Sequence, residues 1–170
     1  MSVPTRHRLG AATFLAAALA AIAIPVPAHA APDFDLVLPA GLACDFDLGL
    51  NITPGEHTVT KEFTDADGNP VRTLTAGRGS ALTFTNVSTG AAVSLESNGS
   101  VSTTTFHADG SSTVQSTGHN VIILFPTDVP AGPTTTLYVG RVTYNATADG
   151  VFTIIGSSGQ TRDICAELDQ

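Results

Sequence analysis

The chain has 170 residues, with seven Lys and Arg against 15 Asp and Glu, two Cys and no Trp. Its formal net charge of −8 leaves no basic stripe for the phosphates of a nucleic acid, so a nucleic-acid partner is excluded. The same charge disfavours attachment to an anionic membrane surface.

The first thirty residues have the layout of a secretory signal peptide. Arg6, His7 and Arg8 form a basic start, an apolar run extends from Leu9 to Ile24, and Ala28-His29-Ala30 is an Ala-x-Ala cleavage site. We expect cleavage after Ala30 and export by general secretion, which makes the protein secreted and extracellular. The mature chain, residues 31–170, then keeps five basic residues against 15 acidic ones, a net charge of −10.

Two kinds of membrane attachment are disfavoured. The apolar run is short and rich in Ala, and no later stretch approaches eighteen apolar residues, so no transmembrane segment is expected. Lipid attachment at Cys44 would require a Leu three positions earlier, but Gly41 occupies that position, so lipid attachment is not expected.

Residues 31–43 are predicted to be an N-terminal leader without regular structure, because Pro32, Pro39 and Gly41 interrupt it. From Cys44 to Ile52 apolar and polar residues alternate, which predicts a half-buried strand with Cys44 on the buried face. Residues 44–170 are predicted to form a single disulfide-linked β domain.

Short strands are expected along the rest of the domain, with no helical period anywhere. They cover residues 57–64, 71–75, 81–87, 91–96, 101–107, 112–117, 121–125, 134–145, 151–155 and 161–166. Turns are predicted at Asn98-Gly99, Ala108-Asp109-Gly110 and Gly118-His119-Asn120, among others. The unbroken apolar run Val121–Phe125 is typical of a strand that is buried on both faces.

Cys44 and Cys165 stand near opposite ends of the domain, and in an oxidising compartment they are expected to form one disulfide; two free thiols are the alternative. Such a bond places the first and last elements side by side. The fold class predicted is therefore all-β: an antiparallel meander of about ten short strands in a closed or nearly closed β-barrel. A β-sandwich is the alternative.

The sequence predicts no catalytic, cofactor-binding or metal site, and no cofactor. The histidines His57, His107 and His119 have no second ligand at a short spacing, as zinc would require. Asp65-Ala66-Asp67-Gly68-Asn69 resembles the opening of a calcium loop. An EF-hand would need Gly and Glu where Pro70 and Ala76 stand.

Other kinds of enzyme also lack a signature. There is no Gly-x-Ser-x-Gly nucleophile motif, and Gly156-Ser157-Ser158-Gly159 is predicted to be a turn. Sugar-binding clefts usually have aromatic platforms, and the mature chain offers only Tyr138 and Tyr144 with no Trp. Glycosidase and lectin functions are accordingly disfavoured.

Several short motifs resemble a group of small exported actinobacterial proteins without established function. They are Ala43-Cys44-Asp45-Phe46, Leu82-Thr83-Phe84-Thr85-Asn86, Thr89-Gly90, Phe106-His107-Ala108-Asp109-Gly110, Gly140-Arg141-Val142-Thr143-Tyr144 and Asp163-Ile164-Cys165-Ala166. The resemblance spans Cys44 to Cys165 and implies export, paired cysteines and an all-β fold. It implies no activity and no site residues.

The leading functional hypothesis is a non-enzymatic extracellular domain that binds a small apolar ligand, or a protein or envelope partner. The alternatives are a small secreted enzyme with its site inside a barrel, and a structural matrix component. A solidly packed interior would count against both pocket hypotheses. Such an interior would be built from Phe46, Leu48, Phe84, Phe106, Leu124 and Phe152.

Overall fold

Ten strands and one short helix make up the part of the chain that the computed structural model describes, residues 32–170. The predicted signal peptide and cleavage site lie outside the described residues. The elements are β1 (Leu36–Leu38), β2 (Leu48–Thr53), β3 (Val59–Thr64), β4 (Pro70–Arg78), β5 (Ala81–Asn86), β6 (Ala92–Leu95), β7 (Gly99–Phe106), β8 (Ser112–Leu124), β9 (Thr134–Ala146), β10 (Phe152–Asp163) and α1 (Ile164–Leu168).

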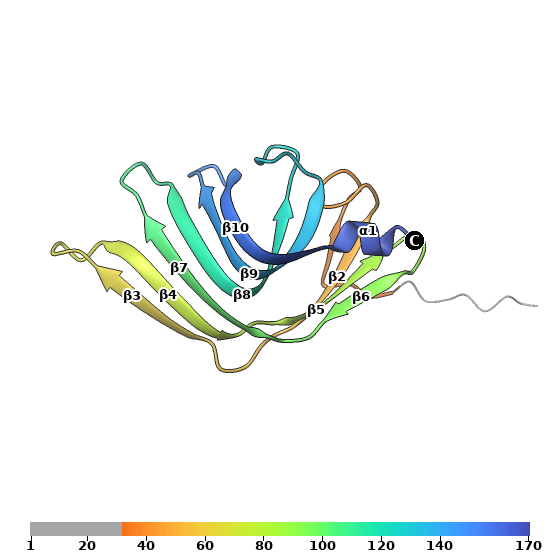
Figure 1. Cartoon of the computed structure of the whole chain (residues 1–170), viewed down its shortest axis with the longest axis horizontal. Coiled ribbons are helices and arrows are strands. Elements are labelled where there is room, and N and C mark those ends of the chain that lie inside the picture. The colour runs from red at the N-terminus through yellow and green to blue at the C-terminus, as the bar shows by residue number, and fades with distance from the viewer. Residues whose placement is uncertain (1–31) are drawn as a thin grey trace, which may run out of the picture. The chain divides into compact units, whose positions relative to one another are not determined.

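The strands form two antiparallel sheets within the unit Asp33–Gln170 (Figure 1). The four-stranded sheet has the order β1-β2-β5-β6, and the six-stranded sheet has the order β10-β9-β8-β7-β4-β3. The all-β prediction is confirmed, but the predicted closed barrel is wrong. Since β10 and β3 lie at opposite edges of one sheet and do not pair, the sandwich alternative fits the two-sheet arrangement better.

Four local predictions are also wrong. The predicted leader contains β1, which pairs with β2 from Leu36↔Leu50 to Leu38↔Leu48. The turns predicted at residues 118–120 and 156–159 lie inside the long strands β8 and β10. Cys165 lies in α1 rather than in a strand, because the Asp163 carboxylate caps that helix by accepting a hydrogen bond from the Ala166 amide at 3.0 Å.

A row of glycines crosses the six-stranded sheet. Gly118, Gly140 and Gly159 are paired in register on β8, β9 and β10, and all three have a positive φ. A Cβ atom on Gly140 would collide with the carbonyl oxygen of Ser158, and one on Gly159 with the carbonyl oxygen of Val139. The neighbouring backbones therefore reach this conformation and this proximity only because the side chains are absent.

The strands β8, β9 and β10 are strongly curved (Figure 1). The glycine row divides β8 and β9 into two arms: the near arm, which packs against the four-stranded sheet, and the far arm beyond the glycines. The near arm comprises residues 119–124 of β8 and 134–139 of β9, and the far arm comprises residues 112–117 and 141–146. Ile122 of the near arm and Val142 of the far arm share one buried cluster. Val142 pairs with Ser116, which lies six positions before Ile122 on β8. In a flat strand, Ser116 and Ile122 would be about 20 Å apart. The sheet is therefore folded over on itself.

A loop after β8 holds the two arms together. This loop, residues 126–133, is here called the strap. Asp128, which is buried, accepts hydrogen bonds from the Phe125 amide at 2.6 Å and from the Phe152 amide at 2.7 Å. Val129 adds backbone hydrogen bonds to Phe152 and Ile154 at 2.8 and 2.7 Å. Because Phe125 follows the near arm and β10 flanks the far arm, these contacts stabilise the bend.

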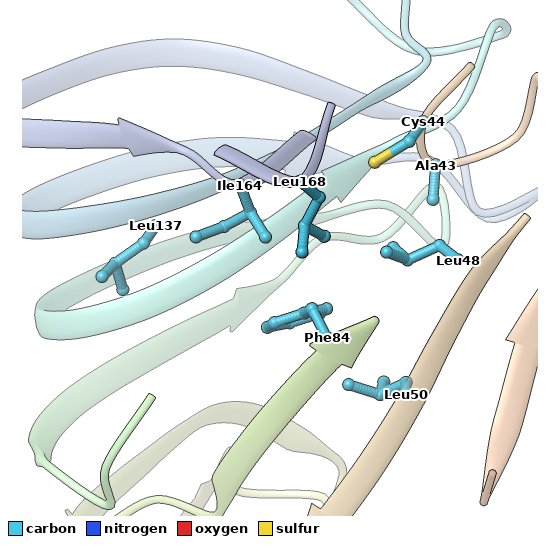
Figure 2. Close-up of a cluster of buried hydrophobic side chains, with 8 residues drawn as sticks. All are labelled: Ala43, Cys44, Leu48, Leu50, Phe84, Leu137, Ile164 and Leu168. Atoms are coloured by element: carbon cyan, nitrogen blue, oxygen red, sulfur yellow. The ribbon is translucent and has the colours of Figure 1, made fainter. Parts of the chain in front are cut away.

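The main core lies between the near arm, the four-stranded sheet and α1 (Figure 2). Its buried members are Ala43, Cys44, Leu48, Leu50, Phe84, Leu137, Ile164 and Leu168. Val121 and Ile123 pack against this cluster, whereas Ile122 and Leu124 face the cluster inside the bend. Both faces of residues 121–124 are therefore covered, although Val121 and Ile123 are only partly buried. The prediction of burial is wrong for Phe125, which is 38% exposed. Phe106, predicted to be core, is 42% exposed.

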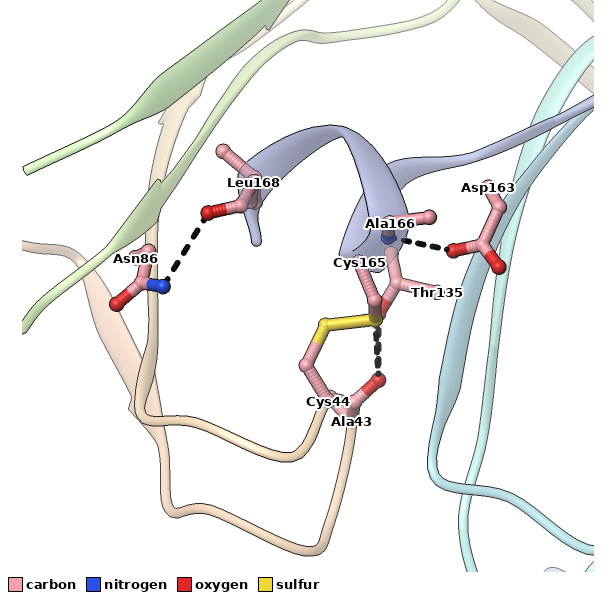
Figure 3. The surroundings of a disulfide bond; sticks show 8 residues. All are labelled: Ala43, Cys44, Asn86, Thr135, Asp163, Cys165, Ala166 and Leu168. Carbon is pink, nitrogen blue, oxygen red and sulfur yellow. Dashed lines mark hydrogen bonds between the residues drawn. A yellow bond between two sulfur atoms is a disulfide. The ribbon is translucent and has the colours of Figure 1, made fainter. Parts of the chain in front are cut away.

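The predicted disulfide between Cys44 and Cys165 is confirmed (Figure 3), with the two Cα atoms 5.5 Å apart. It joins the loop before β2 to α1, so it links the two sheets and does not close one of them. The buried Thr135 hydroxyl donates a hydrogen bond to the Ala43 carbonyl at 3.1 Å beside the bond. The Asn86 amide holds the end of α1 through the Leu168 carbonyl at 3.3 Å. Covalent and polar contacts therefore converge where the sheets meet.

Reduction of the disulfide is expected to lower the free energy of unfolding by about 4–5 kcal/mol, because the closed loop spans 121 residues. The far-ultraviolet circular dichroism of the strands should not change below the transition. Denaturant unfolding with and without strong reductant measures both quantities. Unchanged unfolding, with both thiols accessible to alkylation beforehand, would contradict the assignment.

Substitution Gly140→Ala is expected to lower the free energy of unfolding by at least about 2 kcal/mol, through positive φ and the collision with Ser158. The matched control is Gly156→Ala in β10, where a Cβ atom meets nothing within 4 Å. That control should change stability by less than about 1 kcal/mol. Equal losses in the two variants, measured by denaturant unfolding, would show that the row does not require glycine.

Candidate functional site

A cleft of about 500 Å³ opens where the two sheets diverge. One wall is an apolar row, Ile52, Leu82 and Leu95, whose members are in register across β2, β5 and β6. The facing wall carries Val121 and Leu137, which are paired on the near arm. The volume lies in the range that small-molecule sites commonly have.

The inner end of the cleft is lined by hydroxyl groups. Ser100, Ser102 and Ser116 reach it from β7 and β8, and the Ser102 and Ser116 hydroxyls are hydrogen-bonded to each other at 2.9 Å. The same row continues outward through Thr75 to Thr60, whose hydroxyls are 3.0 Å apart. A ladder of hydroxyls therefore runs from the edge strand β3 into the cleft.

Asn120 is the polar residue of the cleft whose bonding is incomplete. Its Nδ2 atom is shielded from solvent and has no hydrogen-bond partner among the described residues. An unsatisfied buried donor costs about 1–3 kcal/mol, and native proteins contain few of them. Because Asn120 lines the cleft, a turn of its side chain would bring this amide to an oxygen acceptor on a ligand.

Three titratable side chains line the cleft: Glu96 and His119, which are exposed, and Tyr144, which is partly buried. Burial raises the pKa of the Tyr144 phenol above its ordinary value, since removal from water disfavours the phenolate. At neutral pH Tyr144 is therefore a neutral hydroxyl that can donate or accept a hydrogen bond. It packs against Phe152, with ring centroids 5.0 Å apart.

A second hollow adjoins the cleft and shares Leu95, Glu96, Asn98, His119 and Leu137 with it. Arg162 lines that hollow and pairs with Glu167, with nitrogen–oxygen distances of 2.7 and 3.0 Å. These hydrogen bonds lower the pKa of Glu167 and raise that of Arg162. Since both side chains are substantially exposed, the pair adds little stability.

The histidines singled out in the sequence lie on separate elements. His57 is in the loop before β3, 3.7 Å from Glu56; His107 donates to or accepts from the Thr113 hydroxyl at 2.9 Å; His119 lines the cleft. Among residues 32–170, no three His, Cys, Asp or Glu side chains gather where they could hold a metal ion.

The acidic turns use their carboxylates to fix the chain. Asp65 accepts hydrogen bonds from the amides of Asp67 and Asn69, both at 2.9 Å, and the bonds from Asn69 are the main cause of its lowered pKa. Asp109 accepts from the Ser111 hydroxyl and amide at 2.6 and 2.9 Å, which lowers its pKa likewise. These contacts are those of turn-capping residues.

Sequence reasoning missed most of the cleft. It singled out His119 and Tyr144, but it placed Asn120 in a turn and gave no role to Ser100, Ser102 or Ser116. The signal that could have found them is an isolated Gly inside a long Ser-, Thr- and Val-rich stretch, which indicates a bend within one strand.

Comparison of the chain with protein-family models, curated proteins and solved structures finds no match. The class of protein is therefore defined by the fold: an antiparallel two-sheet β protein with one disulfide. Among the described residues there is no helix of sufficient length and apolar character to cross a membrane.

Titration of Tyr144 provides a test of its burial in the cleft. In a Tyr138→Phe variant it is the only Tyr, and the chain has no Trp, so tyrosinate absorbance reports it alone. Its midpoint in the folded protein should lie above 10, and the value in denaturant should be about 10. Because the folded-state pKa is the higher one, this contribution to stability is present below pH 10 and lost as pH rises through the folded pKa. Equal midpoints in the two states would contradict the burial.

Proposed function

We propose that residues 31–170 form an exported, non-enzymatic binding domain that holds a small ligand in the cleft between its sheets. The observation that carries this proposal is the buried Asn120 amide without a partner, in a cleft of ligand size. Export rests on the signal-peptide pattern of residues 1–30, and the disulfide is compatible with it.

The lining of the cleft defines the chemistry of the ligand. Ile52, Leu82 and Leu95 favour an apolar body, whereas Asn120 and the serine hydroxyls favour an oxygen acceptor at one end. The ligand proposed is therefore amphiphilic rather than wholly apolar. Its oxygen would restore the missing hydrogen bond, and its apolar part would be removed from water between the sheets.

The polar contacts in the cleft support binding rather than catalysis. A nucleophilic hydroxyl needs an adjacent base, but the Ser116 hydroxyl is paired with the Ser102 hydroxyl. Glu96 and His119 are exposed to solvent, where a catalytic acid or base would not be shielded from water. A secreted enzyme and a matrix component remain the alternatives to a binding domain.

Native mass spectrometry of residues 31–170, exported from a bacterial host, tests the proposal. We expect a reproducible extra mass that is lost on denaturation, and a denatured mass two hydrogens below that of the reduced chain. A Ser100→Phe variant, which places an aromatic ring in the cleft, should lose the extra mass.

The matched control is Thr105→Phe, at an exposed position on the other face of β7, which should retain the extra mass. Unfolding curves would show that both variants fold. A bare mass for the unsubstituted protein, or an extra mass equally present in all three proteins, would contradict ligand binding in this cleft.

A further inference from the structure

The cleft exposes the edge of a strand. β8 pairs with β9 along its whole length, Ser112 to Leu124, but β7 pairs with β8 only from Ser112 to Gly118. Beyond Gly118, no described strand takes the place of β7. The segment His119–Leu124 is therefore the edge strand of the near arm, and His119, Asn120, Val121 and Ile122 line the cleft.

An unpaired strand edge presents backbone N–H and C=O groups at a regular spacing. The natural partner of such a row is another extended backbone, which pairs with it at about 4.7–4.9 Å. From this edge and its walls we infer that the cleft receives an extended peptide segment of another protein, added to β8 as a strand. This inference rests on the proposed function of the cleft as a binding site, and it names a peptide rather than a small molecule as the occupant.

The walls of the cleft set the side-chain pattern of that segment. In a strand added to β8, successive side chains would point alternately to the two faces of the sheet. One set would meet the apolar row Ile52, Leu82 and Leu95, and the other set would meet the hydroxyls of Ser102 and Ser116. A sequence that alternates apolar and small polar residues fits both walls.

The length of the free edge and the charge around the cleft further restrict which peptides fit. The strap closes the edge beyond Leu124, where the Gly132 amide donates a hydrogen bond to the Phe125 carbonyl at 2.9 Å. About five or six residues can therefore lie along β8. Glu96 stands at the cleft, and the mature chain carries a net charge of −10, so basic rather than acidic residues should flank the segment.

The probe is the synthetic peptide Lys-Thr-Val-Thr-Val-Thr-Val-Lys, titrated into residues 31–170 and followed by amide resonances in NMR spectra. Amides of His119–Leu124 should shift. Two further peptides carry N-methyl groups on the three Thr or on the three Val. Only alternate residues of an added strand bond to the edge, so one of these peptides should bind about tenfold more weakly or worse. The other should stay within about threefold of the parent.

A fourth peptide, Lys-Thr-Thr-Thr-Val-Val-Val-Lys, keeps composition and charge but loses the alternation, and it should also bind at least about tenfold more weakly. Absence of shifts, equal binding by both N-methylated peptides, or shifts confined to β3 or β10 would overturn the inference. The Ser100→Phe variant separates the two hypotheses. If the Ser100→Phe variant loses the co-purified mass while none of the peptides binds the unsubstituted protein, the cleft binds a small ligand and the inference of an added strand is wrong.

Discussion

The close approach of the backbones at Gly118, Gly140 and Gly159 is the constraint on which the remaining architecture depends. Neighbouring strands meet there with a positive φ and without room for a Cβ atom, so all three bend at the same level. Without that bend, Ile122 and Val142 could not share a cluster, and the strap could not reach from Phe125 to Phe152. The bend thus creates a second interior from a single sheet.

The disulfide and the main core act at the other end of the near arm. Leu137 and Ile123 pack the near arm on the four-stranded sheet, and Cys44–Cys165 joins the loop before β2 to α1 in the same core. Few residues of the described chain are fully buried. The disulfide restricts the unfolded chain, and it therefore contributes more to the free energy of unfolding than the burial of any one side chain does. The main core holds one face of the near arm, the cluster of Ile122, Leu124 and Val142 holds the other face, and the cleft forms beside the arm.

Sequence patterns predicted what depends on local chemistry. Alternation and turn dipeptides predicted the β class and most strands. The apolar run from Val121 correctly indicated a strand covered on two faces as far as Leu124, but not at Phe125, which is exposed. The disulfide was predicted from the two cysteines together with the expected export to an oxidising compartment. The closed barrel was predicted wrongly because the two cysteines were expected to join the first and last strands of one sheet. In the structure they join the loop before β2 to α1. Whether the strands form a barrel or two sheets depends on which distant strands pair, and local sequence patterns do not determine that pairing.

The cleft was missed for a related reason. Gly118 marks a bend inside β8, but Gly followed by His and Asn has the composition of a turn, and the sequence analysis divided the strand there. Only the register Gly118↔Gly140↔Gly159 shows that the glycine keeps three strands together. Asn120 then falls on a strand at a cleft rather than in a solvated turn, and its amide becomes a buried donor.

An unpaired strand edge and a buried amide without a partner are both unfavourable in an isolated fold. They occur together at His119–Leu124, where β7 ends and the four-stranded sheet diverges from the near arm. Hydrogen bonding is satisfied at Asp65, Asp109, Asp128 and Thr135, and among residues 32–170 Asn120 Nδ2 is the one buried side-chain polar atom without a partner. Unsatisfied polar groups are concentrated at functional sites, because a bound partner can supply the missing hydrogen bonds. The near arm is held by the core and the strap, and such preorganisation lowers the entropic cost of adding a strand to its free edge.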